Sequence, residues 1–406
     1  MSFLDARRAQ VAKTWALTDE IVLVPSGDPV PIPGTDEFYP FRAHPDHRYL
    51  ADGHEPGHVL VYDAKDDTWT RFAPRPSADD RVWHSASEPV GRPLSELDAM
   101  FEGRSAMVLQ EDATLTAAVT AARRIKDEEE LTRLRAAAAA TAEGFATARK
   151  FAKAGKTEFA VEAELEVGFL RGGGDRSAFD SIVAAGRNAA VLHAAPSTTK
   201  IAKGDFVLID AGAAVGGYSC DCTRTFVVGD ASDDHAAIHA IVLKAQQEAI
   251  AKCKPGVEYR DLHLGASKTM AKGLVKLGVL KGKAQDLVDS GAISLFFPHG
   301  LGHLIGLCTH DPGGYAAGRT RSEHFGLRYL RADLPLEAGM VVTIEPGLYF
   351  IEALLHDPER RAMHKDEVNW ERADELLALG GVRIEDSVHV TDDGPEVLTE
   401  AIPHDV

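Results

Sequence analysis

The amino-terminal part of the chain alternates short apolar runs with turn residues. The aliphatic runs at 21–24 and 58–62 predict strands, and Pro- and Gly-rich turns occupy 29–34 and 74–76. This pattern predicts a smaller α/β domain over residues 1–122.

A different pattern begins at residue 123. The charged run at 123–130 opens an Ala-rich segment that predicts a helix over 127–152, so we place the domain boundary just before it and assign residues 123–406 to a second domain. Thr157 is a suitable N-cap for the next helix. The remaining pattern predicts helices at 158–170, 233–252 and 257–277, and strands at 205–211, 218–228, 340–345 and 382–390.

The charge balance narrows the range of partners. Asp and Glu outnumber Lys and Arg by 62 to 44, giving a net charge of −18. Such a surface repels a polyanion, so nucleic acid is not expected as a partner. No segment has the roughly 18 uninterrupted apolar residues of a membrane helix, and residues 1–20 lack the apolar core of a signal peptide. Four scattered cysteines fit a reducing compartment. We therefore expect a cytoplasmic protein with no membrane partner.

Two aspartates in an apolar hairpin need a compensating charge. If the turn is centred between Val215 and Gly216, Asp210 and Asp221 lie directly opposite each other, with Cβ atoms roughly 5 Å apart. Two carboxylates there repel each other, and aliphatic neighbours solvate them poorly. Arg224, a proton shared by the two acids, or a divalent metal would each supply the compensation.

Three histidines favour the metal. His299, His303 and His310 lie in a Gly-rich segment, where the backbone can approach a site closely. Two more acids, Glu345 and Glu385, stand at the ends of apolar strands. Oxygen ligands with one imidazole suit two divalent ions, manganese first, with cobalt or zinc as alternatives.

Together these segments resemble the metallopeptidase family of the pita-bread fold, which includes prolidases, aminopeptidase P and methionine aminopeptidases. The resemblance spans roughly residues 123–398 and implies an α+β class, with a pita-bread (creatinase/aminopeptidase-like) catalytic domain behind the smaller α/β domain. It also implies a homodimer. The family's metal ligands match Asp210, Asp221, His303, Glu345 and Glu385.

The same resemblance implies further roles. His193 and His299 match histidines of the proline subsite, His310 matches a histidine near the carbonyl oxygen, and Arg383 matches an arginine that orients the dinuclear centre. Arg331 matches the prolidase arginine that binds the substrate's terminal carboxylate. Two positions depart from the family pattern: Phe179 stands where many relatives have Tyr, and Ala194 where they have a larger group.

The segments 298–303 and 344–351 look most like bacterial prolidase, so we expect an Xaa-Pro dipeptidase. Its two ions would activate a water, Glu345 would shuttle the proton, and His310 would stabilise the oxyanion. The stretch 38–50 is also similar to aminopeptidase P, which is the alternative. A third possibility is an inactive peptidase-like module that binds peptides.

Overall fold

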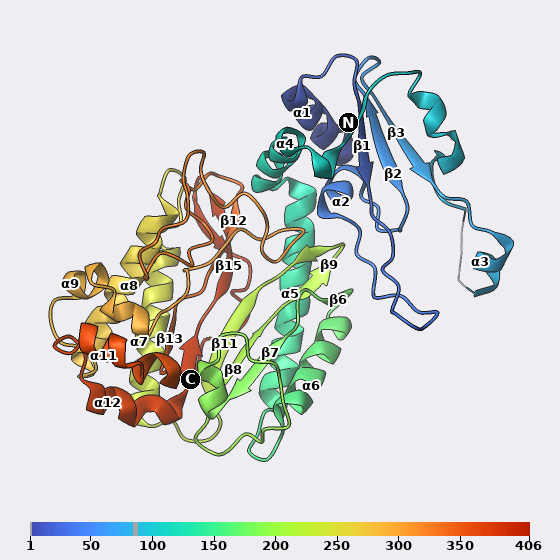
Figure 1. The fold of residues 1–406 in the computed structure, drawn as a ribbon. Helices are drawn as coiled ribbons and strands as arrows, with labels where there is room; N and C mark the ends of the chain where they lie inside the picture. The colour runs from blue at the N-terminus through green and yellow to red at the C-terminus, as the bar shows by residue number, and fades with distance from the viewer. Residues whose placement is uncertain (1, 84–87) are drawn as a thin grey trace. The chain divides into compact units, whose positions relative to one another are not determined.

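The structure is a computed structural model that describes residues 2–83 and 88–406. The chain divides into two compact units, Met1–Arg123 and Arg124–Val406 (Figure 1).

Unit 1 is built on a five-stranded sheet in the order β4-β3-β2-β1-β5. Strand β1 pairs antiparallel with β2 and parallel with β5. Ile21, Val61 and Phe72 form a small buried core on the sheet. The strands are β1 (Ile21–Pro25), β2 (Val59–Asp63), β3 (Thr68–Ala73), β4 (Arg92–Pro93) and β5 (Ala106–Val108), and the helices are α1 (Phe3–Trp15), α2 (Pro45–Ala51), α3 (Ala78–Trp83) and α4 (Ala113–Arg124).

The long helices of unit 2 begin at well-formed caps. Asp127 and Glu130 form a reciprocal capping box at the start of α5. The hydroxyl of Thr157 accepts from the backbone of Ala160 at the start of α6, as predicted. The helices are α5 (Glu128–Phe151), α6 (Glu158–Arg171), α7 (Asp233–Ile250), α8 (Tyr259–Lys276), α9 (Ala284–Asp289), α10 (Glu352–Leu355), α11 (Pro358–Met363) and α12 (Trp370–Glu375).

The strands of unit 2 form four small sheets, in the orders β10-β9-β6, β11-β8-β7, β12-β15-β16 and β13-β14. Helices α5 and α6 pack beside the first two sheets, while α7 contacts the last two. The strands are β6 (Arg176–Ser177), β7 (Ile182–Ala185), β8 (Phe206–Ala211), β9 (Ala213–Val215), β10 (Tyr218–Ser219), β11 (Cys222–Val227), β12 (Val341–Ile344), β13 (Gly347–Tyr349), β14 (Gly381–Arg383), β15 (Asp386–Thr391) and β16 (Gly394–Val397).

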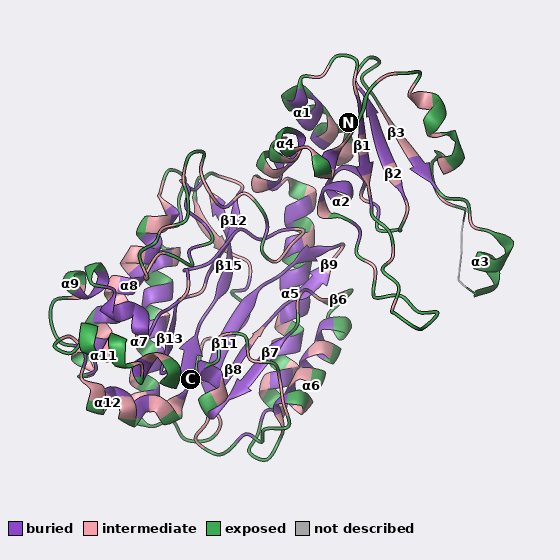
Figure 2. Cartoon of the chain, viewed as in Figure 1, coloured by how far each residue is buried: buried purple, intermediate pink, exposed green. Residues whose placement is uncertain are grey.

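Burial follows this arrangement (Figure 2). The strands of unit 2 are mostly buried, and the helices bury only the faces that meet them. One core cluster lies between α7, α8 and β12–β15, and a second lies between α5, α6 and β7–β11. Cys220 and Cys222 are buried free thiols. None of the described helices combines the length and the apolar character that crossing a membrane requires.

Two strands that were predicted to be continuous are each interrupted in the structure. The strand expected at 382–390 is divided into β14 and β15, and the one at 218–228 into β10 and β11. In each case an acidic residue, Glu385 or Asp221, lies in the gap. The backbone leaves one small sheet and enters another there, so each carboxylate comes from a break in the sheet.

Candidate metal centre

The hairpin that carries the two aspartates has a different register from the predicted one. Gly216 and Gly217 both have positive φ, 54° and 86°, so the turn is centred between them. Asp210 therefore faces Thr223, and Asp221 lies diagonally across from it on the same face. The predicted direct opposition of the two aspartates was wrong: the turn centre lies one residue later, which shifts the returning strand by two residues and keeps both side chains on the same face.

Glu345 and Glu385 come from matching breaks in two paired segments. Ile344 of β12 pairs with Asp386 of β15, and Gly347 of β13 pairs with Arg383 of β14. The register continues across the gap, which places Glu345 across from Glu385. A second hairpin thus presents two carboxylates, as the β8–β11 hairpin does.

His303 reaches the acids from an extended segment beside β12. Leu304 bridges Val342, and the amide of His303 donates to the hydroxyl of Thr343 over 3.0 Å. Gly302 allows this close approach, because a Cβ there would meet the carbonyl oxygen of Thr343 at 2.3 Å. The ring nitrogen Nδ1 of His303 lies 3.0 Å from the carbonyl oxygen of Leu304 and must donate to it, so Nε2 carries a free lone pair. That nitrogen lies 3.4 Å from Oδ2 of Asp221 and 3.7 Å from Oε1 of Glu345.

The donor set fits divalent cations. Asp221, His303 and Glu385 are buried, and one ligand atom from each lies within 4.8 Å of the others. Within the described residues, Oδ1 of Asp210 and Oδ1 of Asp221 are buried without a hydrogen-bond partner. Buried carboxylate oxygens are costly unless a donor or a cation meets them. The five predicted ligands all line one cavity, and two of them present unused oxygen atoms.

Electrostatics support the same conclusion. Burial and the neighbouring Asp210 raise the pKa of Asp221 well above its usual range. Burial raises the pKa of Glu345 to about 7 and also raises that of Glu385, where Asp221 adds to the effect. Burial lowers the pKa of His303, which keeps the imidazole neutral. Cations among these groups would offset the repulsion between the carboxylates.

The arginine that compensates the aspartates is Arg383. Its guanidinium donates to Oδ2 of Asp210 and to Oγ1 of Thr223, whose hydroxyl donates to Glu385 over 2.6 Å. Arg224, the candidate weighed from the sequence, points to the opposite face of β11 and pairs with Asp386 at 2.7 Å. Successive side chains of a strand alternate faces, so Arg224 cannot join the residues on either side of it.

Tyr349 is a residue of the site to which the sequence analysis gave no role. Its hydroxyl receives a hydrogen bond from Arg383 over 2.7 Å and lies 2.9 Å from Nε2 of His299. Nδ1 of His299 lies 2.8 Å from the carbonyl oxygen of Gly300 and must donate to it, so Nε2 accepts from Tyr349. Burial and Arg383 lower the pKa of His299 to about 3, in keeping with a neutral ring. The sequence signal that could have identified it is a tyrosine in the apolar run directly after Glu345.

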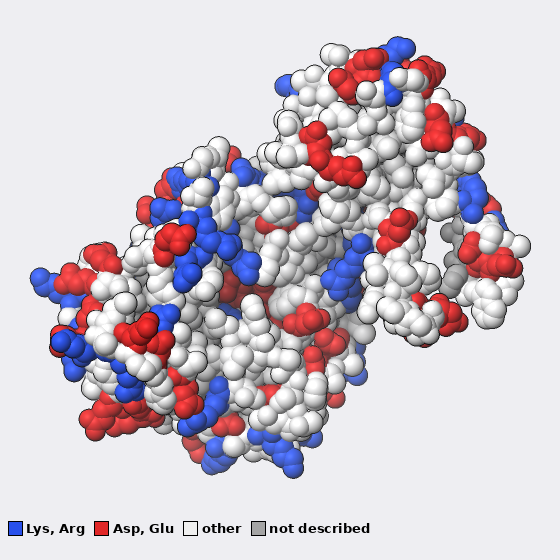
Figure 3. Space-filling view, in the orientation of Figure 1, with Lys and Arg blue, Asp and Glu red and all other residues white. Residues whose placement is uncertain are grey.

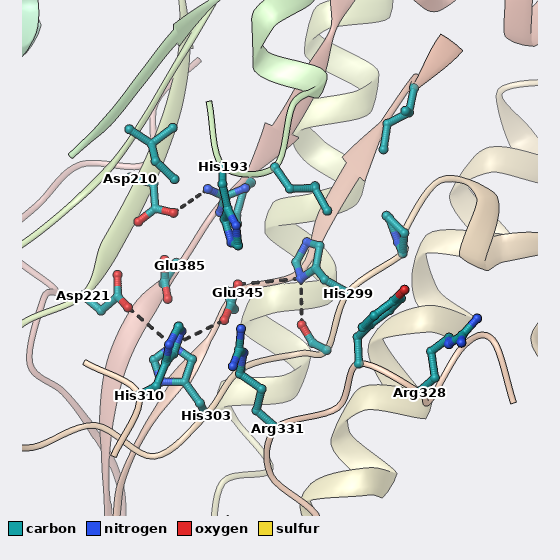
Figure 4. A pocket seen from close by; sticks show the side chains of 18 of the residues that line it. His193, Asp210, Asp221, His299, His303, His310, Arg328, Arg331, Glu345 and Glu385 are labelled. Atoms are coloured by element: carbon teal, nitrogen blue, oxygen red, sulfur yellow. Dashed lines mark hydrogen bonds and ion pairs between the residues drawn. The ribbon is translucent and has the colours of Figure 1, made fainter. Parts of the chain in front are cut away.

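The site opens into a cavity of about 760 Å³ within unit 2 (Figure 4). His193 and Phe179 line it, and the phenylalanine offers no hydroxyl to the carboxylates. His310 packs edge-on against His303 at 4.4 Å, and burial lowers its pKa to about 3. Arg331 reaches toward the metal-ligand residues, and no hydrogen bond or ion pair within the described chain engages its guanidinium. Ala194 is partly buried against a neighbouring apolar cluster.

Family models match both units. Residues 132–392 match metallopeptidase family M24, and residues 4–127 match the aminopeptidase P N-terminal domain. The chain belongs to metallopeptidase family M24. The resemblance and the pita-bread fold class predicted from the sequence are thereby confirmed, and the protein is a metallopeptidase of a family that uses divalent metal ions.

Individual relatives carry two kinds of name. The chain is 32% identical over 407 residues to a probable Xaa-Pro aminopeptidase of Fusarium vanettenii, covering 91% of this chain and 86% of that protein. It is 44% identical over 225 residues to an Xaa-Pro dipeptidase of Stenotrophomonas maltophilia, covering 54% of this chain and 50% of that one. The aminopeptidase PepP structure from Pseudomonas aeruginosa matches with a TM-score of 0.83 and 27% identity, covering 98% of this chain and 95% of the other.

Proposed function

We propose that the protein is a metal-dependent Xaa-Pro aminopeptidase, which releases the amino-terminal residue of a peptide whose second residue is proline. The buried cluster of Asp221, His303 and Glu385, inside a cavity that a short peptide can enter, carries the proposal. The names of relatives and solved structures that match most of the chain support the aminopeptidase better than the dipeptidase that the sequence placed first.

The five predicted ligands would hold two ions: Asp210, Asp221, His303, Glu345 and Glu385. We propose Mn²⁺, with Co²⁺ or Zn²⁺ as alternatives, because oxygen ligands predominate. When bound, such ions lower the pKa of water and polarise the scissile carbonyl. Arg383 would hold Asp210 in place, since it already donates to that carboxylate.

The chain's own groups would then move the proton and shape the pocket. Glu345 would take the proton of the attacking water and deliver it to the leaving proline nitrogen. A neutral His310 would donate one N–H to the developing oxyanion. Both ring nitrogens of His299 are already hydrogen-bonded, so we propose that its ring forms one wall of the proline subsite. His193, which also lines the cavity, would form another part of that wall. Such a site needs no amide N–H from the scissile bond, which a bond to proline lacks.

An Xaa-Pro dipeptidase is the second candidate, and Arg331 favours it. Its guanidinium lines the cavity without an ion-pair partner in the described chain. A carboxylate directly after proline would form a charge-assisted pair with it. The Stenotrophomonas relative bears that name. A longer peptide has no carboxylate at this position, so pairing with Arg331 would favour dipeptides.

Substrate length separates the candidates. With Mn²⁺ supplied, we expect a higher kcat/KM for Ala-Pro-Ala than for Ala-Pro, and loss of both activities on chelation. A preference for Ala-Pro that Arg331→Ala removes would instead establish the dipeptidase, and Arg171→Ala, an exposed arginine outside the cavity, is the matched control.

The same preparation tests two further points. Failure of the Mn²⁺-loaded protein to cleave either peptide would leave the third possibility, an inactive peptide-binding module. We also propose a homodimer, on the strength of the family resemblance, and light scattering after gel filtration would report it as twice the 43.7 kDa chain mass.

A further inference from the structure

Besides Arg383, four arginines line the cavity that holds the metal-ligand residues. They are Arg321, Arg328, Arg331 and Arg360. The only acids among its described lining residues are four of the proposed ligands, Asp210, Asp221, Glu345 and Glu385. In Figure 3, Lys and Arg side chains gather along one margin of the hollow in unit 2. For a chain with a net charge of −18, this local excess of positive charge runs against the average.

These arginines are poorly compensated by the protein. Within the described residues, no carboxylate lies within ion-pair distance of Arg321, Arg328 or Arg331, and Arg360 is 3.8 Å from Asp357. Cations that converge on one cavity also repel one another, and a bound anion would relieve that repulsion.

Two of the arginines are held against aromatic rings. Arg360 lies 4.3 Å from the ring centroid of Phe325, and Arg328 lies 5.4 Å from that of Tyr329. Stacking limits the motion of a guanidinium and leaves its N–H edge available for a planar acceptor. Figure 4 shows Arg331 beside the metal-ligand residues and Arg328 farther from them. The cavity thus offers positive charge at more than one depth.

We propose that Arg328 and Arg360 form a carboxylate subsite beyond the proline, so that the enzyme prefers peptides with Asp or Glu after the proline. This rests on the proposed Xaa-Pro peptidase function and names the substrate class of the same site. A carboxylate side chain in this region can accept hydrogen bonds from the N–H groups of either guanidinium. A neutral isostere gains the packing but not the charge-assisted bonds, while a cationic residue is repelled.

The test uses two amidated peptides that differ only in that charge, Ala-Pro-Glu-NH₂ and Ala-Pro-Gln-NH₂, with the Mn²⁺-supplied protein. We expect the Glu peptide to have a kcat/KM about tenfold higher at low salt, with the ratio falling as ionic strength rises. Arg328→Gln and Arg360→Gln should each lower the ratio several-fold, and the double variant should bring it near one. Arg171→Gln, outside the cavity, should leave the ratio unchanged.

A second readout avoids the chemical step. Inhibition by the products Pro-Glu-NH₂ and Pro-Gln-NH₂ should show the same preference and the same loss in the double variant. Equal kcat/KM for the two peptides in the unmodified protein, or a ratio that survives the double variant, would overturn the subsite. If neither peptide is hydrolysed, the proposed function fails instead, so the two failures are distinguishable.

Discussion

A buried ion pair between Lys126 and Asp311 should stabilise the histidine segment of unit 2. The Nζ of Lys126 lies 3.1 Å from Oδ2 of Asp311, and the two side chains are 0% and 2% exposed. Asp311 also accepts from the backbone of Cys308 and follows His310 directly. The pair therefore fixes the start of unit 2 to the loop that carries a proposed catalytic group.

Lys126→Met keeps most of the length of the side chain and removes its charge, leaving the Asp311 carboxylate buried beside a thioether. Breaking a buried pair on one side costs about 3–5 kcal/mol, because the remaining charge keeps its desolvation penalty. For a unit of this size that corresponds to a fall in Tm of roughly 10 °C. The double variant Lys126→Met/Asp311→Asn removes both charges and retains an acceptor for Cys308. It should recover most of the loss.

Hydrogen exchange measured by mass spectrometry suits this test, because peptides from α5 and α7 report the unfolding free energy of unit 2 separately from that of unit 1. The Lys126→Met variant should lower protection of both helices by the same free energy. A loss below about 1 kcal/mol, or a double variant as unstable as the single one, would refute the reasoning, since the uncompensated charge would then not be the cause.

Three further outcomes follow from the structure. Tyr349→Phe removes the hydroxyl that joins two site residues and should lower kcat/KM about 10–100-fold with the circular dichroism spectrum unchanged; full activity would contradict its positioning role. Burial lowers the pKa of His47 to about 4, so the unfolded chain binds a proton at its ordinary pKa of 6.5 while the folded one does not. The free energy of unfolding of unit 1 should therefore fall by up to about 1.4 kcal/mol per pH unit as pH drops from 6.5 toward 4. The His47→Gln variant should flatten that slope in urea titrations followed by tryptophan fluorescence. An unchanged slope would exclude His47 as the source. Gly168→Ala would put a Cβ 2.5 Å from the Cα of Gly144 and should cost about 1–2 kcal/mol, whereas Gly265→Ala meets only a lysine amine at 3.9 Å and should gain about 0.5–1 kcal/mol; equal effects on thermal unfolding would show that the helix contact is not tight.

Local signals in the sequence predicted most elements of the fold. The charged start and Ala-rich composition of 127–152, and the N-cap Thr157 before the next helix, placed α5 and α6 within a residue or two. The apolar runs located β1, β2 and β8 equally well. These features depend on neighbours in the chain, so a pattern of a few residues is enough to identify them.

The errors and omissions depend on the backbone conformation of one turn and on contacts between distant segments. The hairpin register turned on which pair of residues adopts positive φ, and Arg383 displaced Arg224 as the partner of Asp210 because the faces of β11 alternate. The pairing of Lys126 with Asp311 joins residues far apart in the chain, and no local pattern announces it. The proposed ligands were found from the family motifs, whereas the arginine lining of the cavity became visible only in three dimensions.

Because Glu345 and Glu385 lie at breaks in carboxyl-terminal strands, the site can form only late in synthesis of the chain. Both side chains reach the site through the pairing of β12 with β15, and the carbonyl oxygens of Ile402 and Pro403 accept from Arg224, directly behind Glu385. A nascent chain still lacking these segments cannot assemble the five side chains around one point. Peptide hydrolysis would therefore begin only after translation has passed β15, which makes enzymatic activity a direct report that the carboxyl-terminal strands have docked.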